Sequence, residues 1–365
     1  MRIATVFGTR PEIIRLSAVL ARLDASCEHV TIHTGQNFDP RLAQIFFEEL
    51  QVRTPDFSLN VRESGYAAQV GAIIARAGEV FEHVRPDRLL VLGDTNSALS
   101  VLPAKRLGIP VFHMEAGNRC FEDRVPEEVN RRVVDHASDV LLPYTENSRN
   151  NLLREGIHPA RIHVTGNPIA EVLHAQAARI AASAAGAALH LKPRGYLLAT
   201  VHRAENVDSP ERLAALFAGL EQAAVACETP VLVSVHPRTR VRMADSGLRP
   251  GARVHLSEPF GFADFAALER DALCVLTDSG TVQEECTILR VPCVTLRDCT
   301  ERPETLECGS VVLAGALPAA IVRCVKLAVA GGTGWAVPVE YANRHVSEVV
   351  LKLLHGSLPS VGGSS

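Results

Sequence analysis

The sequence lacks a strong net charge, a long apolar run and paired cysteines. The formal net charge is −4 at pH 7, which gives no reason to expect nucleic acid or an anionic membrane as a partner. No apolar run reaches the roughly 20 residues that a membrane-spanning helix needs. The nine cysteines include no Cys-x-x-Cys pair and lie mostly in apolar runs. We therefore expect reduced core thiols in a cytoplasmic protein.

Several common cofactor signatures are also missing. No G-x-G-x-x-G fingerprint follows a predicted strand, and neither a P-loop, an HExxH motif nor a zinc-binding cysteine spacing occurs. The glycine-rich residues 331–334 follow a predicted helix, so we interpret them as a turn. The first residues enter a predicted strand at once, which leaves no room for a signal peptide.

The sequence does contain a regular alternation of apolar strands and helices. Its 365 residues, 47% of them hydrophobic, suffice for two domains with their own cores. The predicted strands cover residues 3–7, 30–34, 88–92, 111–114, 140–143, 196–201, 231–235, 253–256, 273–277 and 291–296. The predicted helices of the first half cover residues 11–23, 40–50, 97–107 and 127–138. Near-continuous Val, Ile and Leu in the strands favours parallel sheets buried on both faces.

This alternation predicts an α/β protein with two doubly wound, Rossmann-like domains. We place the domains at residues 1–170 and 171–339, because an alanine-rich helical stretch at 175–189 and a turn at 192–195 interrupt the pattern. Residues 340–355 form a predicted helix that could return to the first domain, and the tail 356–365 is predicted to be disordered. Ligands are expected at the carboxyl ends of both sheets, in a cleft between the domains.

Polar or charged residues follow five of the predicted strands. Asp94 and Glu115 come directly after apolar strands, where a carboxylate is costly unless it is paired or used. Asp94 could instead only cap a helix. Glu127 and Glu128 lie four residues before Arg131 and Arg132, a spacing that also fits a salt-bridged solvent face. The alternative is that Glu127 forms a carboxylate cluster with Asp94 and Glu115.

Cations and histidines occupy the other strand ends. Arg10, after the first strand, is either a ligand-binding group or a solvated loop residue. His202 and His236 end two strands of the second half, where they could act as acid, base or phosphate donor, or lie on the surface. Ser279 and Gly280 form a small-residue turn before a helix, a geometry that favours an anion such as a diphosphate. Arg302, from the next loop, would add a forked cation.

These loops, in this order, resemble the non-hydrolysing UDP-N-acetylglucosamine 2-epimerases. The matching motifs are GTRPE (8–12), TGQ (34–36), GDTNS (93–97), EAGNR (115–119), PEEVNRR (126–132), TGNP (165–168), HRAEN (202–206), SEPF (257–260), TDSGTVQEE (277–285) and RDCTERPE (297–304). They cover residues 3–315. The resemblance implies a glycosyltransferase-B-like fold, a UDP-sugar substrate, no nicotinamide cofactor, no metal requirement and a homodimer.

The resemblance also assigns roles to individual positions. It implies that Asp94, Glu115, Glu127 and His202 are the catalytic residues. It implies that Arg10, Arg15, Arg131, His236, Phe260, Phe265, Ser279, Gly280, Glu285 and Arg302 bind the nucleotide-sugar. Within that set, Glu285 would accept from ribose hydroxyls, and Phe260 and Phe265 would line a uracil pocket.

The chain departs from the family at three places. Arg15 replaces a common lysine, Asn37 stands where many members have histidine, and the segment 120–125 is short. The amino-acid sequences of that segment and of residues 8–17 resemble those of the branch that makes UDP-N-acetyl-L-fucosamine from a 6-deoxy-L-talose precursor. The expected reaction is inversion at C2 by elimination of UDP and re-addition, on either this sugar or UDP-N-acetylglucosamine. The rival interpretations are a hydrolysing epimerase, a glycosyltransferase and a UDP-sugar sensor without turnover.

Overall fold

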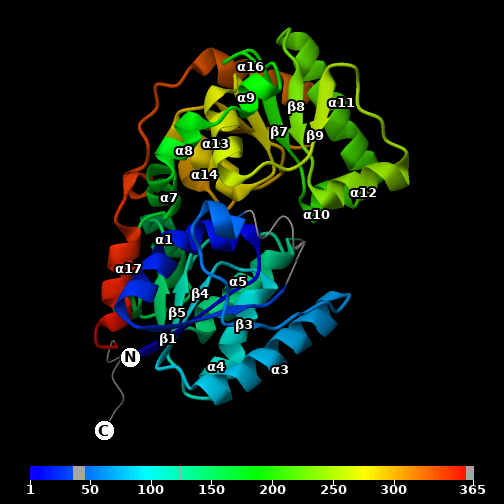
Figure 1. The fold of residues 1–365 in the computed structure, drawn as a ribbon. Coiled ribbons are helices and arrows are strands. Elements are labelled where there is room, and N and C mark those ends of the chain that lie inside the picture. Colours follow the sequence, from blue (N-terminus) through cyan, green and yellow to red (C-terminus); the bar gives the residue numbers. More distant parts are fainter. Residues whose placement is uncertain (36–45, 124, 359–365) are drawn as a thin grey trace. The chain divides into compact units, whose positions relative to one another are not determined.

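The computed structural model describes residues 1–35, 46–123 and 125–358 (Figure 1). The chain forms two compact units: residues 1–174 together with 339–365, and residues 175–338. Gln36, Asn37, most of the predicted helix 40–50 and most of the predicted tail 356–365 lie outside the described residues. The cleft predicted between the domains stays a prediction.

The first unit contains a parallel sheet of six strands in the order β3-β2-β1-β4-β5-β6. The strands are β1 (Arg2–Phe7), β2 (Glu28–His33), β3 (Phe57–Ser58), β4 (Arg88–Leu92), β5 (Val111–Met114) and β6 (Val140–Leu142). The register aligns Ile3 of β1 with His29 of β2 on one side and with Arg88 of β4 on the other. The strand order reverses direction between β1 and β4, and this switch point is where open α/β sheets bind ligands, at the carboxyl ends of the strands.

The second unit repeats the same topology. Its sheet has the order β12-β11-β10-β7-β8-β9, so the switch point lies between β7 and β10. The strands are β7 (Leu197–Thr200), β8 (Val231–Ser234), β9 (Val254–Ser257), β10 (Cys274–Thr277), β11 (Cys293–Thr295) and β12 (Val311–Leu313). Both units are therefore Rossmann-like, and the fold is glycosyltransferase-B-like, as predicted.

Helices connect successive strands in both units. The first unit has α1 (Arg10–Ser26), α3 (Tyr66–Val84), α4 (Val101–Arg106), α5 (Pro126–Ala137), α6 (Glu146–Arg154), α7 (Ile169–Ala175) and α17 (Val346–His355), with short 3-10 helices η1 (Asn96–Ser100), η2 (Pro159–Arg161) and η3 (Val339–Ala342). The second unit has α8 (Ala177–Ala182), α9 (Ala185–Ala188), α10 (Ala204–Val207), α11 (Pro210–Ala226), α12 (Pro237–Ser246), α13 (Phe262–Asp271), α14 (Gly280–Leu289), α15 (Pro303–Glu307) and α16 (Pro318–Gly331). Among the described residues, no helix combines the length and apolar character needed to cross a membrane.

The carboxyl-terminal helix α17 packs against α1 and belongs to the first unit (Figure 1). Val350 and Leu354 of α17 are fully buried there. At the end of the helix, the Arg88 guanidinium donates to the backbone oxygen of Gly356 at 2.7 Å. The last carbonyls of α17 are thus satisfied by a cation, which also suits the negative end of the helix dipole.

The sequence-based elements needed several corrections. The predicted helix 340–355 is divided into η3 and α17. Asn343 lies between these two helices, and its side chain donates to the backbone oxygen of Thr165, which holds the chain out of a continuous helix. The alanine-rich stretch 175–189 divides into α8 and α9, where Ser183 bonds Asp264 of α13 at 2.6 Å. Helix α3 and the short strands β3 and β12 were not predicted.

Candidate active-site residues at the carboxyl ends of both sheets

In the first unit, the loops after β1, β4 and β5 carry the predicted residues. Arg10 begins α1, and its guanidinium carbon lies 5.6 Å from the centre of the Phe46 ring. Asp94 follows β4, and Glu115 follows the neighbouring strand β5. Because β4 and β5 are parallel and adjacent, the two carboxylates belong to the same edge of the sheet.

Asp94 is held by the guanidinium of Arg131. Nε and Nη2 of Arg131 donate to Oδ2 of Asp94 at 3.0 and 2.5 Å, and Asn130 donates to the Asp94 backbone oxygen at 3.0 Å. The Asp94 side chain is 21% exposed, whereas that of Arg131 is 4% exposed. The aspartate is therefore oriented from the protein side and still reachable by a ligand. Asp94 does not act merely as a helix cap: the hydroxyl of Thr95 accepts from the Ser97 backbone N–H at the start of η1.

Glu115 adopts an uncommon backbone conformation and forms a buried ion pair. Its φ of +63° lies in the left-handed region, which costs a non-glycine residue free energy and is found disproportionately at functional sites. Its carboxylate accepts from Nη1 of Arg15, and from Nδ2 of Asn118 at 3.1 Å. Arg15, expected to bind substrate, lies nearly buried with its guanidinium carbon 6.0 Å from the Tyr144 ring centre. In the structure, the ion pair with Arg15 orients the Glu115 carboxylate.

Helix α5 supplies the third acidic position. Glu127 lies in its first turn and is half-buried. The predicted pair of Glu128 with Arg132 is present at 3.0 Å, and Glu128 also accepts from Arg131 at 2.7 Å. Glu128 and Arg131 are buried, so the solvent-face interpretation is wrong for them.

A second buried network connects β5, α5 and the end of β4. His113 contacts the backbone oxygen of Gly93 through Nε2 and the carboxylate of Asp135 through Nδ1, each at 2.8 Å. Asp135 also pairs with Arg119 at 2.8 Å. Burial acts to raise the pKa of Asp135, but His113 and Arg119 outweigh it and hold that pKa below its usual range. This network fixes the backbone at Gly93, directly before Asp94.

Glu12 organises the loop after β1. Its Oε2 accepts from the backbone N–H groups of Gly8 and Thr9 at 3.0 and 2.7 Å, and its Oε1 accepts from the Thr95 hydroxyl at 2.9 Å. Burial raises the pKa of Glu12 to about 7 against the opposing effect of these hydrogen bonds. Glu12 therefore ties together the two loops that flank the switch point.

In the second unit, Asp278 and His202 form a dyad at the switch point. Nδ1 of His202 lies 2.9 Å from Oδ1 of Asp278, and the backbone N–H groups of His202 and Arg203 donate to the same carboxylate at 2.9 Å. Asn206 adds a fourth contact at 3.0 Å. Burial acts to raise the pKa of Asp278, yet His202 and these hydrogen bonds hold it well below its usual range. The aspartate therefore stays ionised and leaves Nε2 of the partly exposed His202 available for chemistry.

His236 lies beside this dyad. The two imidazole rings are 5.6 Å apart between centres and inclined by 37°. His236 caps α12, where its Nδ1 accepts from the backbone N–H of Arg238 at 3.2 Å. The loops after β7 and β8 thus bring the two predicted histidines together.

The loop after β10 and Arg302 also meet. Ser279 is the N-cap of α14, and a Cβ added to Gly280 would lie only 3.4 Å from Nη2 of Arg302. The guanidinium therefore covers the first turn of the helix, and it is ion-paired with the fully buried Glu284. A helix N-terminus and a guanidinium in contact are the combination that favours a phosphate group.

The remaining predicted residues of this unit are Phe260, Phe265 and Glu285. Phe260 and Phe265 are partly buried and pack against the core of the second unit. Glu285 is nearly buried and lies beside Glu269. The burial of Glu269 and the like charge of Glu285 raise the pKa of Glu269 well above its usual range. Glu269 is thus neutral beside Glu285.

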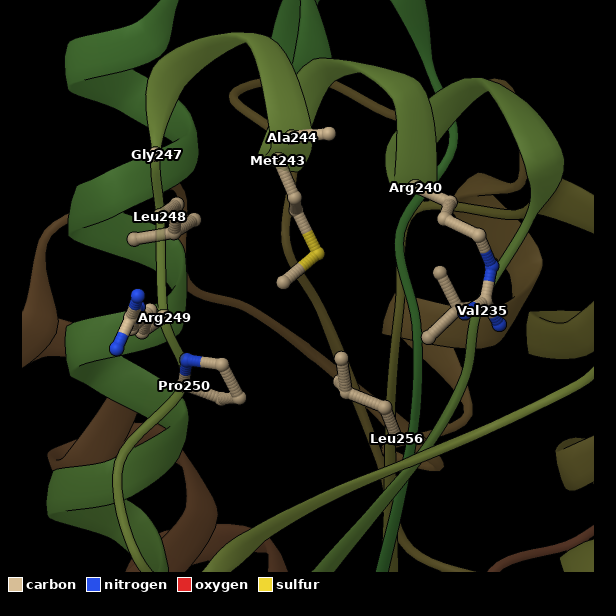
Figure 2. Close-up of a pocket in the computed structure, with 9 residues that line it drawn as sticks. All are labelled: Val235, Arg240, Met243, Ala244, Gly247, Leu248, Arg249, Pro250 and Leu256. Carbon is tan, nitrogen blue, oxygen red and sulfur yellow. The ribbon is translucent and has the colours of Figure 1, made fainter.

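One apolar pocket in the second unit lies away from these residues. It has a volume of about 280 Å³ and is lined by α12, the turn that follows it, and the side chains of Val235 and Leu256. The Met243 side chain points into it (Figure 2). It lies along β8 and β9 rather than at the switch point, and no carboxylate lines it. Within the described ranges, no group of three or more His, Cys, Asp or Glu side chains is placed to hold a metal ion.

The sequence reading missed the residues that orient the predicted ones. Asp278, Glu128, Asp135 and Glu12 were not predicted as part of the site. Asp278, Glu128 and Glu12 lie inside the quoted motifs TDSGTVQEE, PEEVNRR and GTRPE, so their position directly after a strand or at a helix start was the available signal.

Comparison with known proteins gives one consistent result. A family profile described as UDP-N-acetylglucosamine 2-epimerase matches residues 21–354. The UDP-N-acetylglucosamine 2-epimerase of Methanococcus maripaludis is 36% identical over 364 residues, covering 97% of this chain and 98% of its own. The UDP-2,3-diacetamido-2,3-dideoxy-D-glucuronate 2-epimerase of Pseudomonas aeruginosa is 36% identical over 329 residues, covering 89% of this chain and 92% of its own.

Solved structures agree. The UDP-GlcNAc 2-epimerase of Methanocaldococcus jannaschii, crystallised with UDP-GlcNAc and UDP, matches with a TM-score of 0.93 at 36% identity, over 97% of this chain and 99% of the other. The glycosyltransferase WaaG, at 13% identity and a TM-score of 0.57, shares the fold only. With sequence and structure matched over nearly its whole length, the chain belongs to the UDP-N-acetylglucosamine 2-epimerase family.

Proposed function

We propose that this chain is a non-hydrolysing UDP-sugar 2-epimerase that inverts C2 of a UDP-2-acetamidohexose. The observation that carries the proposal is the pair of strand-end carboxylates, Asp94 and Glu115, each held by its own arginine. Carboxylates oriented in this way at the carboxyl edge of a doubly wound sheet suit proton transfer to and from a bound ligand.

The chemistry explains why such groups are needed. The proton at C2 of a 2-acetamido sugar is not acidic while C1 keeps its diphosphate. Breaking the bond between C1 and the diphosphate oxygen makes C1 cationic, and a carboxylate then takes the C2 proton. The products are UDP and a 2-acetamidoglycal. Return of a proton to the opposite face of C2, with UDP rejoining at C1, gives the epimer with no net oxidation.

We assign the base at C2 to the first unit, and the assisting groups and the nucleotide contacts to residues of both units. Asp94 or Glu115 would be the base at C2, with Glu127 and His202 assisting proton return or departure of UDP. The diphosphate charge would be stabilised by Arg10, Arg302 and the turn at Ser279 and Gly280. Further contacts to the UDP-sugar would come from Arg15, Arg131, His236, Phe260, Phe265 and Glu285.

The sugar is the finer part of the proposal. The two relatives described above are named for UDP-N-acetylglucosamine and for a diacetamido-glucuronate, and the wording of residues 8–17 resembles the 6-deoxy-L-talose branch. A panel of these three UDP-sugars, followed by proton NMR, identifies the substrate by its new anomeric signal. We expect a role in amino-sugar or surface-polysaccharide biosynthesis.

Turnover in D₂O tests the mechanism. Each epimer formed should carry deuterium at C2, and epimer without deuterium would contradict elimination and re-addition. Free UDP rising in step with substrate loss would select a hydrolysing enzyme. Binding of every UDP-sugar in the panel without turnover would select a sensor.

A substitution tests the base. We expect Asp94→Asn to lower kcat by about 10²- to 10⁴-fold while UDP still binds in calorimetry. Asp245→Asn, an exposed aspartate of the second unit, serves as the control and should leave kcat unchanged. Wild-type turnover by Asp94→Asn would remove Asp94 from the mechanism.

We also propose that the chain forms a homodimer through the first unit. Val129 and Val133 on α5 are 48% and 39% exposed, and Tyr66 of the neighbouring α3 is 54% exposed. The Tyr66 hydroxyl donates to Asn130 of α5 at 2.9 Å, which places Tyr66 beside the helix that carries both valines. Val129→Asp should yield monomers in light scattering, whereas Val225→Asp on α11 should not. Monomeric wild type would contradict the proposal.

A further inference from the structure

Glu128 carries an unusual concentration of hydrogen bonds for a side chain without solvent contact. Its carboxylate is fully buried. Oε2 accepts from the backbone N–H of Cys120 at 3.1 Å, the Cys120 thiol at 3.3 Å and Nη1 of Arg131 at 2.7 Å. Oε1 accepts from the backbone N–H of Phe121 at 3.2 Å and from Arg132 at 3.0 Å. Donors thus surround both oxygens.

These contacts keep the carboxylate charged. Burial acts to raise the pKa of Glu128, but the Arg131 charge and the donors from Cys120 and Arg132 outweigh it and hold the pKa below its usual range. A neutral amide at this position could not reproduce the arrangement, because either orientation turns its NH₂ group toward existing donors.

Arg131 links Glu128 to Asp94. Its Nη1 donates to Glu128, while its Nε and Nη2 donate to Asp94. A guanidinium is planar and rigid, so fixing one edge on a buried anion fixes the direction of the other edge. The orientation of the Asp94 carboxylate is therefore determined by a group that Asp94 does not touch.

We propose that Glu128 is a positioning residue for the epimerisation, acting through Arg131 to aim the Asp94 carboxylate and fixing the strand-end loop at Cys120 and Phe121. The inference rests on the proposed function, because it assigns Asp94 to proton transfer. It adds a second acidic residue of the same motif with a role distinct from that of Glu127. Glu128 contacts neither substrate nor the reacting atoms in this scheme.

The test compares Glu128→Gln with Arg132→Gln. We expect Glu128→Gln to lower kcat by about 10- to 100-fold, with KM within about twofold of wild type, since misplacing a reactive group by about 1 Å costs up to about 10²-fold. Arg132→Gln removes one donor from Glu128 but leaves the link to Arg131, so its kcat should stay near that of wild type. A Glu128→Gln enzyme with wild-type kcat would overturn the inference.

A double-mutant cycle separates positioning from a merely structural role. If Glu128 acts through Arg131, Glu128→Gln should cost little further kcat in the Arg131→Gln background, whereas independent effects would multiply. Arg131→Lys covers the case in which Glu128→Gln does not fold, because a lysine cannot span both carboxylates. Its kcat should fall by at least about tenfold, and a wild-type kcat would also overturn the inference. Wild type that fails to incorporate C2 deuterium defeats the proposed function instead.

Discussion

Gly8 offers a test of how tightly the strand-end loops are packed in the first unit. A Cβ added at this position would lie 2.0 Å from Oγ1 of Thr34 and 2.3 Å from Oγ of Ser97. Those two hydroxyls form a buried hydrogen bond of 2.7 Å with each other. Gly8→Ala must therefore push apart two hydroxyls, one directly after β2 and one in η1 after β4.

The magnitude follows from two contributions. Inserting a methyl group into a packed site costs about 1–3 kcal/mol, and breaking the hydrogen bond costs about 1 kcal/mol more. We expect a loss of about 3 kcal/mol in the free energy of unfolding of the first unit. For a unit of this size, that lowers the melting temperature by roughly 6–12 °C.

Gly71→Ala provides the matched control, since it is the same chemical change with the opposite expected sign. Gly71 lies inside α3, and a Cβ there would meet no atom within 4 Å. Replacing a helical glycine by alanine should stabilise the protein by about 0.5–1 kcal/mol. Both variants are measured by circular dichroism melting in one buffer. A Gly8→Ala melting temperature within about 1 °C of wild type, or a decrease in both variants, would refute the reasoning.

Three further predictions concern buried groups. Asp278→Asn should lower the free energy of unfolding by about 3 kcal/mol in urea titration, because the new amide faces the backbone N–H of His202. The surface change Asp271→Asn should leave the free energy of unfolding within about 0.5 kcal/mol of the wild-type value. The pKa of Glu12 rises from 4.5 to about 7 on folding, so the folded state keeps a proton that the unfolded chain loses, and stability should fall as pH rises between these values. Glu12→Gln should abolish this decline of about 3 kcal/mol between pH 4.5 and 7, and an equal decline in both proteins would contradict it. Leu354→Ala should cost the first unit about 2–5 kcal/mol, and an unchanged melting curve would show that α17 is dispensable.

Most of the fold could be predicted because the strands have one physical cause. A strand buried on both faces must be apolar throughout, and each of the ten predicted runs overlaps an observed strand. The short strands β3 and β12 were not predicted, because two or three paired residues are too few to show the hydrophobic pattern of a strand. The alanine-rich stretch was predicted as helical, but its break depends on Ser183 meeting Asp264, a contact that helix propensity does not contain.

The candidate site divides in the same way. The chain position of Asp94 and Glu115 after apolar strands marked them as candidates, because a carboxylate there is costly unless it is paired or used, and the family resemblance then assigned them a catalytic role. Their arginine partners were not deducible: Arg131 follows Asp94 by 37 residues, and Arg15 precedes Glu115 by 100. The i,i+4 helix spacing predicted an ion pair between Glu127 and Arg131, whereas in the structure Arg131 pairs with Asp94 and Glu128.

Both units solve one problem in the same manner. In the proposed site, a side chain that transfers a proton must be held in a fixed direction, and in each unit a buried, ionised carboxylate provides that support. Glu128 collects two backbone N–H groups and acts on Asp94 through Arg131, while Asp278 collects two backbone N–H groups and acts directly on His202. A carboxylate is suited to this task because its two oxygens can accept from backbone N–H groups and from a cationic side chain at the same time. The same group then fixes both the shape of the loop and the direction of the side chain. Loss of either carboxylate should therefore lower kcat, although neither is assigned a contact with the substrate.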